Sequence, residues 1–133
     1  MNNKLYDFAD LGGRILISLI FVMAGATKIT GYAGTAAYMA SKGIPGVLLP
    51  LVIATELGGG LLVLLGLWTR AAAFAVGGFS ALAALLFHTD FSNQVDQIMF
   101  MKDFALAGGF LFIFAHGAGA FSLDAWRAKK AAP

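Results

Sequence analysis

The sequence contains no cysteine. This absence excludes disulfide bonds, thiolate-bound metal sites and a CxxC redox relay. Histidine is scarce as well, with two in 133 residues, so few side chains remain that could bind a transition metal. We therefore predict no metal site.

Charged residues are also rare, at 12% of the chain. Soluble domains usually carry about a quarter charged residues. The net charge of +2 is small, and no basic run is long enough to predict a nucleic-acid partner. The one basic cluster, Arg127, Lys129 and Lys130, is typical of an anchor flanking a membrane segment.

Hydrophobic residues, by contrast, make up 59% of the chain, and the mean hydropathy is +0.82. A helix that spans a bilayer needs about 20 mostly apolar residues. Four stretches qualify, at roughly 11–29, 46–67, 70–88 and 97–116. No alternating strand pattern is present, and only helices or closed barrels satisfy their backbone in lipid. The lipid bilayer is therefore the first predicted partner.

These stretches predict an all-α membrane protein with one domain over residues 1–133, a four-transmembrane-helix antiparallel bundle. The link "WTR" (68–70) is so short that the second and third spans must form an antiparallel hairpin. Between the first two spans, residues 32–43 predict a short interfacial helix. Pro45 and Pro50 fall near the start of the second span, where a missing N–H costs little.

Basic residues predict the orientation. With both termini in the cytoplasm, six of the nine basic residues lie inside and Lys28, Lys42 and Lys102 lie outside, as the positive-inside rule favours. The first span, with Lys4 and Arg14 before it, also looks like a secretory signal peptide. Two acidic residues in its amino-terminal part and three later hydrophobic stretches argue against this, so we expect no cleavage.

Glu56 is the only charged residue between Lys42 and Arg70, and it falls near the predicted midplane of the membrane. Its side chain is too short to reach the headgroups. Because intramembrane ionisable residues mark functional sites by default, we assign Glu56 as a candidate proton relay.

Small or polar residues follow one face of each span, and such faces favour close helix packing in the bundle interior. Glu56 shares its face with Gly59 and Gly60. The other faces are Arg14, Ser18, Phe21, Gly25 and Lys28; Arg70, Phe74, Gly77, Ala81, Ala84 and His88; and Lys102, Leu106, Gly109, Ile113 and His116.

Four more residues gather near the predicted outer side and are candidate ligand-binding residues: Lys28, His88, Lys102 and Asp103. Near the inner side, Arg14 and Arg70 are candidate structural charges. The alternative is that the basic residues reach the headgroups with their long stems and that His88 is merely interfacial.

The two histidines bear on cofactors. His88 and His116 fall at opposite sides of the membrane, which argues against a bis-histidine haem. A quinone needs only an aromatic-lined cleft with one or two polar groups, and the sequence permits one.

Several motifs carry a family resemblance. The segments "ILISLIFVMAGATKITGYAGTAAYMASKGIP", "ATELGGGLLVLLGLWTR", "KDFALAGGF" and "GAGAFSLD" together resemble the DoxX family of small four-helix bacterial membrane proteins. The stretch "GTAAYMASKGIP" is most similar to its YphA/YqjF-type inner-membrane members. The residues that match the family pattern are Arg14, Lys28, Glu56, Gly59, Gly66, Arg70, His88, Lys102 and Asp124. Asp103 departs from it, because the family more often has Asn there.

The resemblance implies a location in the bacterial inner membrane and three hypotheses for function. The family takes its name from a subunit of a thiosulfate:quinone oxidoreductase, so the first is a subunit or helper of a quinone-linked redox system, with a soluble or membrane redox partner. The second is a non-enzymatic scaffold that stabilises a partner, its buried charges fixing helix register. The third is a small solute or proton carrier. Enzymatic activity and homo-oligomer formation stay open at this point.

Overall fold

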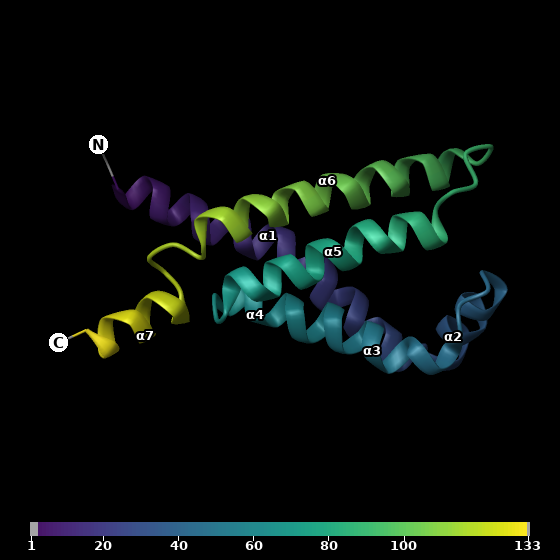
Figure 1. Cartoon of the computed structure of the whole chain (residues 1–133), viewed down its shortest axis with the longest axis horizontal. Coiled ribbons are helices and arrows are strands. Elements are labelled where there is room, and N and C mark those ends of the chain that lie inside the picture. The colour runs from purple at the N-terminus through teal and green to yellow at the C-terminus, as the bar shows by residue number, and fades with distance from the viewer. Residues whose placement is uncertain (1–2, 133) are drawn as a thin grey trace.

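The computed structural model describes residues 3–132, and all regular structure in that range is helical. Figure 1 shows the arrangement. The elements are α1 (Asn3–Thr30), α2 (Tyr32–Ser41), η1 (Gly46–Leu48), α3 (Leu49–Ile53), η2 (Ala54–Gly59), α4 (Gly60–Leu65), α5 (Thr69–Phe87), α6 (Gln94–His116) and α7 (Leu123–Ala131).

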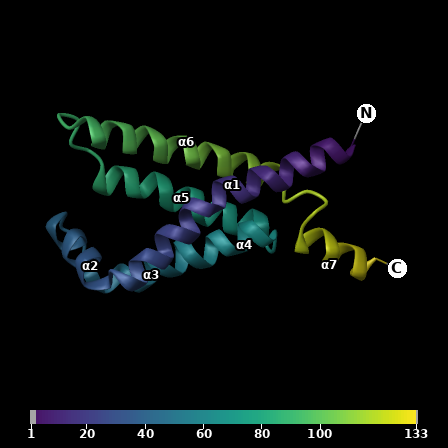
Figure 2. The ribbon, with the colours of Figure 1, turned by 180° about the vertical axis from the view of Figure 1, so that it is seen from behind.

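Four helical segments are long and apolar enough to cross a membrane: Lys4–Thr30, Gly46–Leu65, Thr69–Phe87 and Gln94–His116. They confirm the predicted four-span, all-α fold. In Figure 1, α5 and α6 lie side by side and antiparallel, and Figure 2 shows α1 crossing the bundle against α3 and α4. The two ends of the chain lie at the same end of the bundle. A short helix, α2, does separate the first two spans, and its place at the membrane interface stays a prediction.

The second span is irregular. It begins with the 3-10 turn η1, continues through α3 with Pro50 in its first turn, and widens into the π-helical turn η2 before α4. Glu56 lies within η2. Such π turns inside α-helices often occur at functional sites. The span ends at Gly66, whose positive φ of 70° terminates the helix in the left-handed conformation that glycine adopts at little cost.

Glycines bring the helices together. A Cβ atom on Gly25 would lie 2.7 Å from Leu57, and one on Gly77 would lie 2.8 Å from Phe110, so only glycine permits these approaches. Around these contacts lies a core of buried apolar side chains: Phe21, Val63, Ala72, Ala73, Val76 and Phe110.

The predicted interior faces are correct for α1 and partly wrong for α5. On α1, the side chains of Arg14, Ser18 and Phe21 are buried. On α5, Phe74 and Arg70 are exposed, whereas Val76 and Ser80 are buried instead. The reason is that α5 packs against α6 on one side and against the second span on the other, which rotates its buried face.

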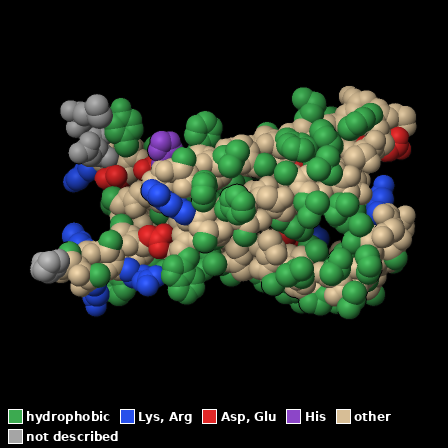
Figure 3. All heavy atoms as spheres, in the orientation of Figure 1, with side chains coloured by type: hydrophobic (Ala, Val, Ile, Leu, Met, Phe, Trp, Pro, Cys, Tyr) green, Lys and Arg blue, Asp and Glu red, His purple; other side chains and the backbone are tan. Residues whose placement is uncertain are grey.

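The surface has the pattern of a membrane protein. Figure 3 shows hydrophobic side chains over the middle of the molecule, with acidic and basic side chains towards its two ends. Large apolar side chains such as Leu16, Met23, Phe112 and Met101 are more than half exposed, as lipid-facing residues would be.

Candidate functional site: an aromatic cavity with a buried ion pair

A cavity of about 240 Å³ lies among α1, α2, the second span, α5 and α6. It is mostly apolar, and several of its lining residues are aromatic: Phe21, Tyr38, Phe79 and Phe87. The ring of Tyr38 on α2 stacks on that of Phe87 on α5, with centroids 5.7 Å apart and 22° between the planes. α2 therefore forms one wall of the cavity.

Four ionisable side chains also line this cavity: Lys28, Glu56, His88 and Asp103. They come from α1, η2, the carboxyl end of α5 and α6. The structure thus brings together three of the four residues predicted to bind a ligand and the candidate proton relay. The fourth, Lys102, is exposed to the outside and is not part of the lining.

Glu56 and Lys28 form an ion pair in the cavity. The Nζ atom of Lys28 lies 2.7 Å from Oε1 of Glu56, whose side chain is only 6% exposed, against 27% for Lys28. Oε1 is buried, and the ammonium of Lys28 is its ionic partner. A carboxylate can accept several hydrogen bonds, and this oxygen therefore has unused capacity.

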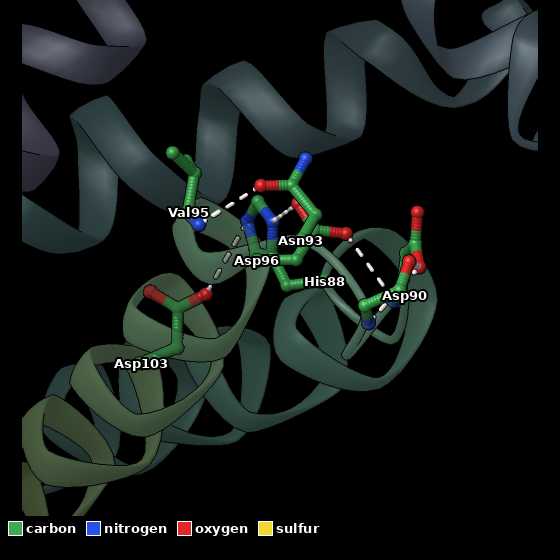
Figure 4. Close-up of polar contacts among 7 residues, drawn as sticks. His88, Asp90, Asn93, Val95, Asp96 and Asp103 are labelled. Atoms are coloured by element: carbon green, nitrogen blue, oxygen red, sulfur yellow. Dashed lines mark hydrogen bonds and ion pairs between the residues drawn. The ribbon is translucent and has the colours of Figure 1, made fainter.

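His88 lies between two carboxylates of α6, as Figure 4 shows. Its Nε2 atom is 3.8 Å from Oδ2 of Asp103, and its Nδ1 atom is 3.9 Å from Oδ1 of Asp96. Both distances are longer than a hydrogen bond. His88 and Asp103 line the cavity and Asp96 does not, so the imidazole lies between the cavity and the first turn of α6.

A second polar cluster lies at the opposite end of the bundle, around Arg14. Its side chain is 2% exposed, and Nη1 donates hydrogen bonds to the carbonyl oxygens of Val63 and Leu64, at 3.1 Å each. Nη2 donates to the carbonyl oxygen of Phe121. Carbonyls in the last turn of a helix have no partner within it, so Arg14 satisfies the end of α4 and ties it to the segment before α7. It does not reach towards headgroups.

Asp124 completes this inner junction. Its carboxylate accepts hydrogen bonds from the backbone N–H of Trp68 and Thr69 and from the Thr69 hydroxyl, at 2.8, 2.9 and 2.6 Å. Partial burial on its own would raise the pKa of Asp124, but these hydrogen bonds outweigh it and hold the pKa below its ordinary value. Asp124 thus caps α5 from α7. Arg70 is exposed nearby, with its guanidinium beside Gly117.

The second histidine, His116, is not part of the cavity lining. His116 ends α6, at the far end of the bundle from His88. Within residues 3–132, no three His, Asp or Glu side chains are placed to hold a metal ion.

Sequence reasoning missed several participants. Asp96 could have been found, because it precedes Asp103 by seven residues and so lies on the same face of α6. The capping role of Asp124 and the π turn around Glu56 left no comparable signal, since both depend on how distant segments pack.

The sequence matches a known family and several known proteins. The DoxX family model matches residues 9–89. The inner membrane protein YqjF of Escherichia coli is 49% identical over 127 residues, 96% of this chain and 98% of that protein. The chain belongs to the DoxX family. This DoxX protein is also 36% identical to the inner membrane protein YphA of E. coli, over 84% of each chain.

A more distant relative of this DoxX protein has a name that refers to chemistry. A Bacillus subtilis protein named "Putative oxidoreductase CatD" is 37% identical over 68 residues, 51% of each chain. No solved structure matches the chain.

Proposed function

We propose that this DoxX protein is an inner-membrane component of a quinone-linked redox system, and that it holds a quinone-type ring in the cavity beside Glu56 and Lys28. The cavity itself carries the proposal. Its walls are aromatic and aliphatic, and its few polar groups come from different helices. This is the composition of sites that bind flat, mostly apolar ligands and orient them through one or two contacts.

The size of the cavity favours a ring over a larger ligand. Pockets for drug-sized ligands are typically about 300–1,000 Å³. At about 240 Å³, this cavity suits a single substituted ring, with any isoprenoid tail remaining in the surrounding lipid.

In this proposal Glu56 handles a proton. Reduction of a quinone to a quinol consumes two electrons and two protons, and a carboxylate beside the ring can give or take one of those protons. Lys28 balances the charge of Glu56 at 2.7 Å. A redox partner protein supplies or removes the electrons, since the chain has no cysteine to hold an iron–sulfur cluster or a dithiol.

The proposed location and orientation follow from the relatives and the charge pattern. Two relatives are named inner membrane proteins. The two ends of the chain lie at the same end of the bundle. In the topology predicted from the sequence, six of the nine basic residues lie on the side of the membrane that holds both termini. With both termini in the cytoplasm, the cavity would lie in the periplasmic half of the membrane.

A scaffold is the second candidate, and the Lys28–Glu56 contact favours it in one respect. The pair joins α1 to the second span, so it could fix the register of these helices without any ligand. The substitution Glu56→Gln separates the two functions, because the amide keeps the shape and hydrogen-bonding capacity but cannot exchange a proton. A redox role predicts a folded but inactive variant, and a scaffold role predicts a folded and active one.

Quinone content of protein purified from native membranes tests the proposal directly. We expect quinone, quantified by mass spectrometry, to be enriched over the bulk lipid. Ala83→Phe, which fills the cavity, should abolish the enrichment, and Ala75→Phe, on an exposed face of α5, should retain it. Equal quinone in wild type and Ala83→Phe, or no enrichment in wild type, would contradict the proposal.

A further inference from the structure

The helix α7 carries aromatic and basic side chains at the end of the bundle where both ends of the chain lie (Figure 1). We infer that α7, together with the turn before α5, forms a binding site for the headgroup of an anionic phospholipid. The site is separate from the cavity, none of whose lining residues belongs to α7 or to that turn. The inference is therefore independent of the proposed function.

The position of Trp68 gives the depth of this site in the membrane. Trp68 lies in the short link between two membrane spans, the first ending at Leu65 and the second beginning at Thr69. Its side chain is 59% exposed. Tryptophan is enriched at the boundary between hydrocarbon and headgroups, because its ring is apolar and its N–H group is polar. A side chain that contacts the Trp68 ring therefore lies at the depth of the headgroups.

Two basic side chains lie over the rings of the two tryptophans. The guanidinium carbon of Arg127 is 5.6 Å from the centre of the Trp68 ring, and the ammonium of Lys130 is 4.6 Å from that of Trp126. Trp126 lies one helical turn before Lys130 in a helix that leads away from the bundle, so the lysine points back towards the spans. These contacts order both cations before a ligand arrives, which reduces the entropic cost of binding it.

The positive charges of this site are not neutralised by the protein. Within residues 3–132, Arg70, Arg127 and Lys130 form no ion pair with a carboxylate, and all three are exposed. The oxygens of the nearby Asp124 already accept hydrogen bonds from the start of α5. Guanidinium and ammonium groups bind phosphate oxygens through charge-assisted hydrogen bonds. A negatively charged group is therefore the ligand that fits.

Apolar side chains beside these charges favour a lipid as the ligand. Trp126 and Phe121 are 54% and 41% exposed, next to the basic residues of α7. A phospholipid offers a phosphate to the cations and an acyl chain to the aromatic rings, whereas a water-soluble anion offers only the charge. Because a zwitterionic headgroup carries its own ammonium group, we expect the site to prefer an anionic lipid such as phosphatidylglycerol.

Tryptophan fluorescence reports directly on this site, because Trp68 and Trp126 are the two tryptophans of the chain. The full-length protein is reconstituted into vesicles of equimolar phosphatidylglycerol and phosphatidylcholine. In one preparation only the phosphatidylglycerol carries bromine atoms on its acyl chains, which quench tryptophan, and in the other only the phosphatidylcholine does. We expect phosphatidylglycerol to be preferred beside the tryptophans by about threefold or more.

The double variant Arg127→Gln/Lys130→Gln should make the quenching by the two lipids nearly equal. The matched control is Lys42→Gln/Lys102→Gln, which removes the same charge from the outer side of the predicted topology and should keep the preference. In wild type, added salt should weaken the preference, since salt screens exposed charges. Inorganic phosphate should weaken it no more than chloride does at equal ionic strength.

Each of the opposite results would overturn the inference. Equal quenching by the two lipids in wild type would refute lipid selection and leave an acidic protein as the partner of this basic surface. A preference that the double variant keeps, or that the control loses to the same extent, would exclude α7 as its cause. A loss specific to inorganic phosphate would assign the site to free phosphate. If the double variant does not fold, a salt-insensitive preference in wild type is sufficient to refute an electrostatic site.

Discussion

Replacing Arg14 with glutamine tests whether the inner junction, rather than the headgroup region, is where this arginine acts. In the structure its guanidinium donates to three carbonyl oxygens, on Val63, Leu64 and Phe121. Hydrogen bonds from a charged donor contribute about 1.5–3 kcal/mol each. A glutamine amide could replace one of them, so two are lost. We expect the free energy of unfolding to fall by about 3 kcal/mol, taking the lower figure for each.

Tryptophan fluorescence reports this junction directly. The chain has two tryptophans, Trp68 just before α5 and Trp126 in α7, and both lie next to the segments that Arg14 ties together. Titration with sodium dodecyl sulfate in mixed micelles, followed by fluorescence and by circular dichroism, gives the unfolding midpoint. The midpoint of Arg14→Gln should lie well below that of wild type.

Arg70→Gln is the matched control, because Arg70 is an exposed arginine near the same end of the molecule. Exposed charges usually contribute less than about 1 kcal/mol. The structure therefore predicts a near wild-type midpoint for Arg70→Gln. A wild-type midpoint for Arg14→Gln, or equal losses in the two variants, would contradict the assignment of Arg14 to the inner junction.

Two further predictions concern the same end of the molecule. The hydrogen bonds to Asp124 lower its folded-state pKa, so its stabilisation is present at neutral pH and is lost as the pH falls from the ordinary carboxyl pKa of about 3.9 through the lower folded-state pKa. Asp124→Asn should cost about 1 kcal/mol at pH 7, because the charged acceptor is lost, and this cost should shrink as the pH falls through that range, as denaturant titrations at several pH values would show. The orientation is tested with two reporters fused to the carboxyl terminus, one that works only in the cytoplasm and one that works only in the periplasm. We expect only the cytoplasmic reporter to be active, and activity of the periplasmic reporter alone would reverse the proposed topology.

Much of the fold could be predicted from the sequence, because bilayer thickness and backbone hydrogen bonding leave few solutions for long apolar segments. The four spans and the hairpin through "WTR" follow from length and hydropathy alone. The predicted start of the first span, at residue 11, differs most from the structure. The helix α1 begins at Asn3 instead, because its first turns include charged residues that the hydropathy pattern excludes from a span.

The candidate site was only partly predictable. Glu56 stood out because a carboxylate in an apolar run needs a partner or a cavity. Its choice of Lys28 over Lys102 could not be read from the sequence, since both fall at similar predicted depth. The packing decides it: Lys28 points inward from α1, and Lys102 lies on the outer face of α6.

By itself, the amino-acid sequence of this DoxX protein determined that it is a four-span membrane protein with a costly acid in its second span, because hydropathy and charge are local properties. The tertiary structure decided which charges meet. It widened the backbone at Glu56 into a π turn, placed His88 between Asp96 and Asp103, and set Asp124 on the start of α5. Each of these depends on the relative rotation and crossing of helices that are distant in sequence, and packing fixes that rotation only when the whole bundle forms.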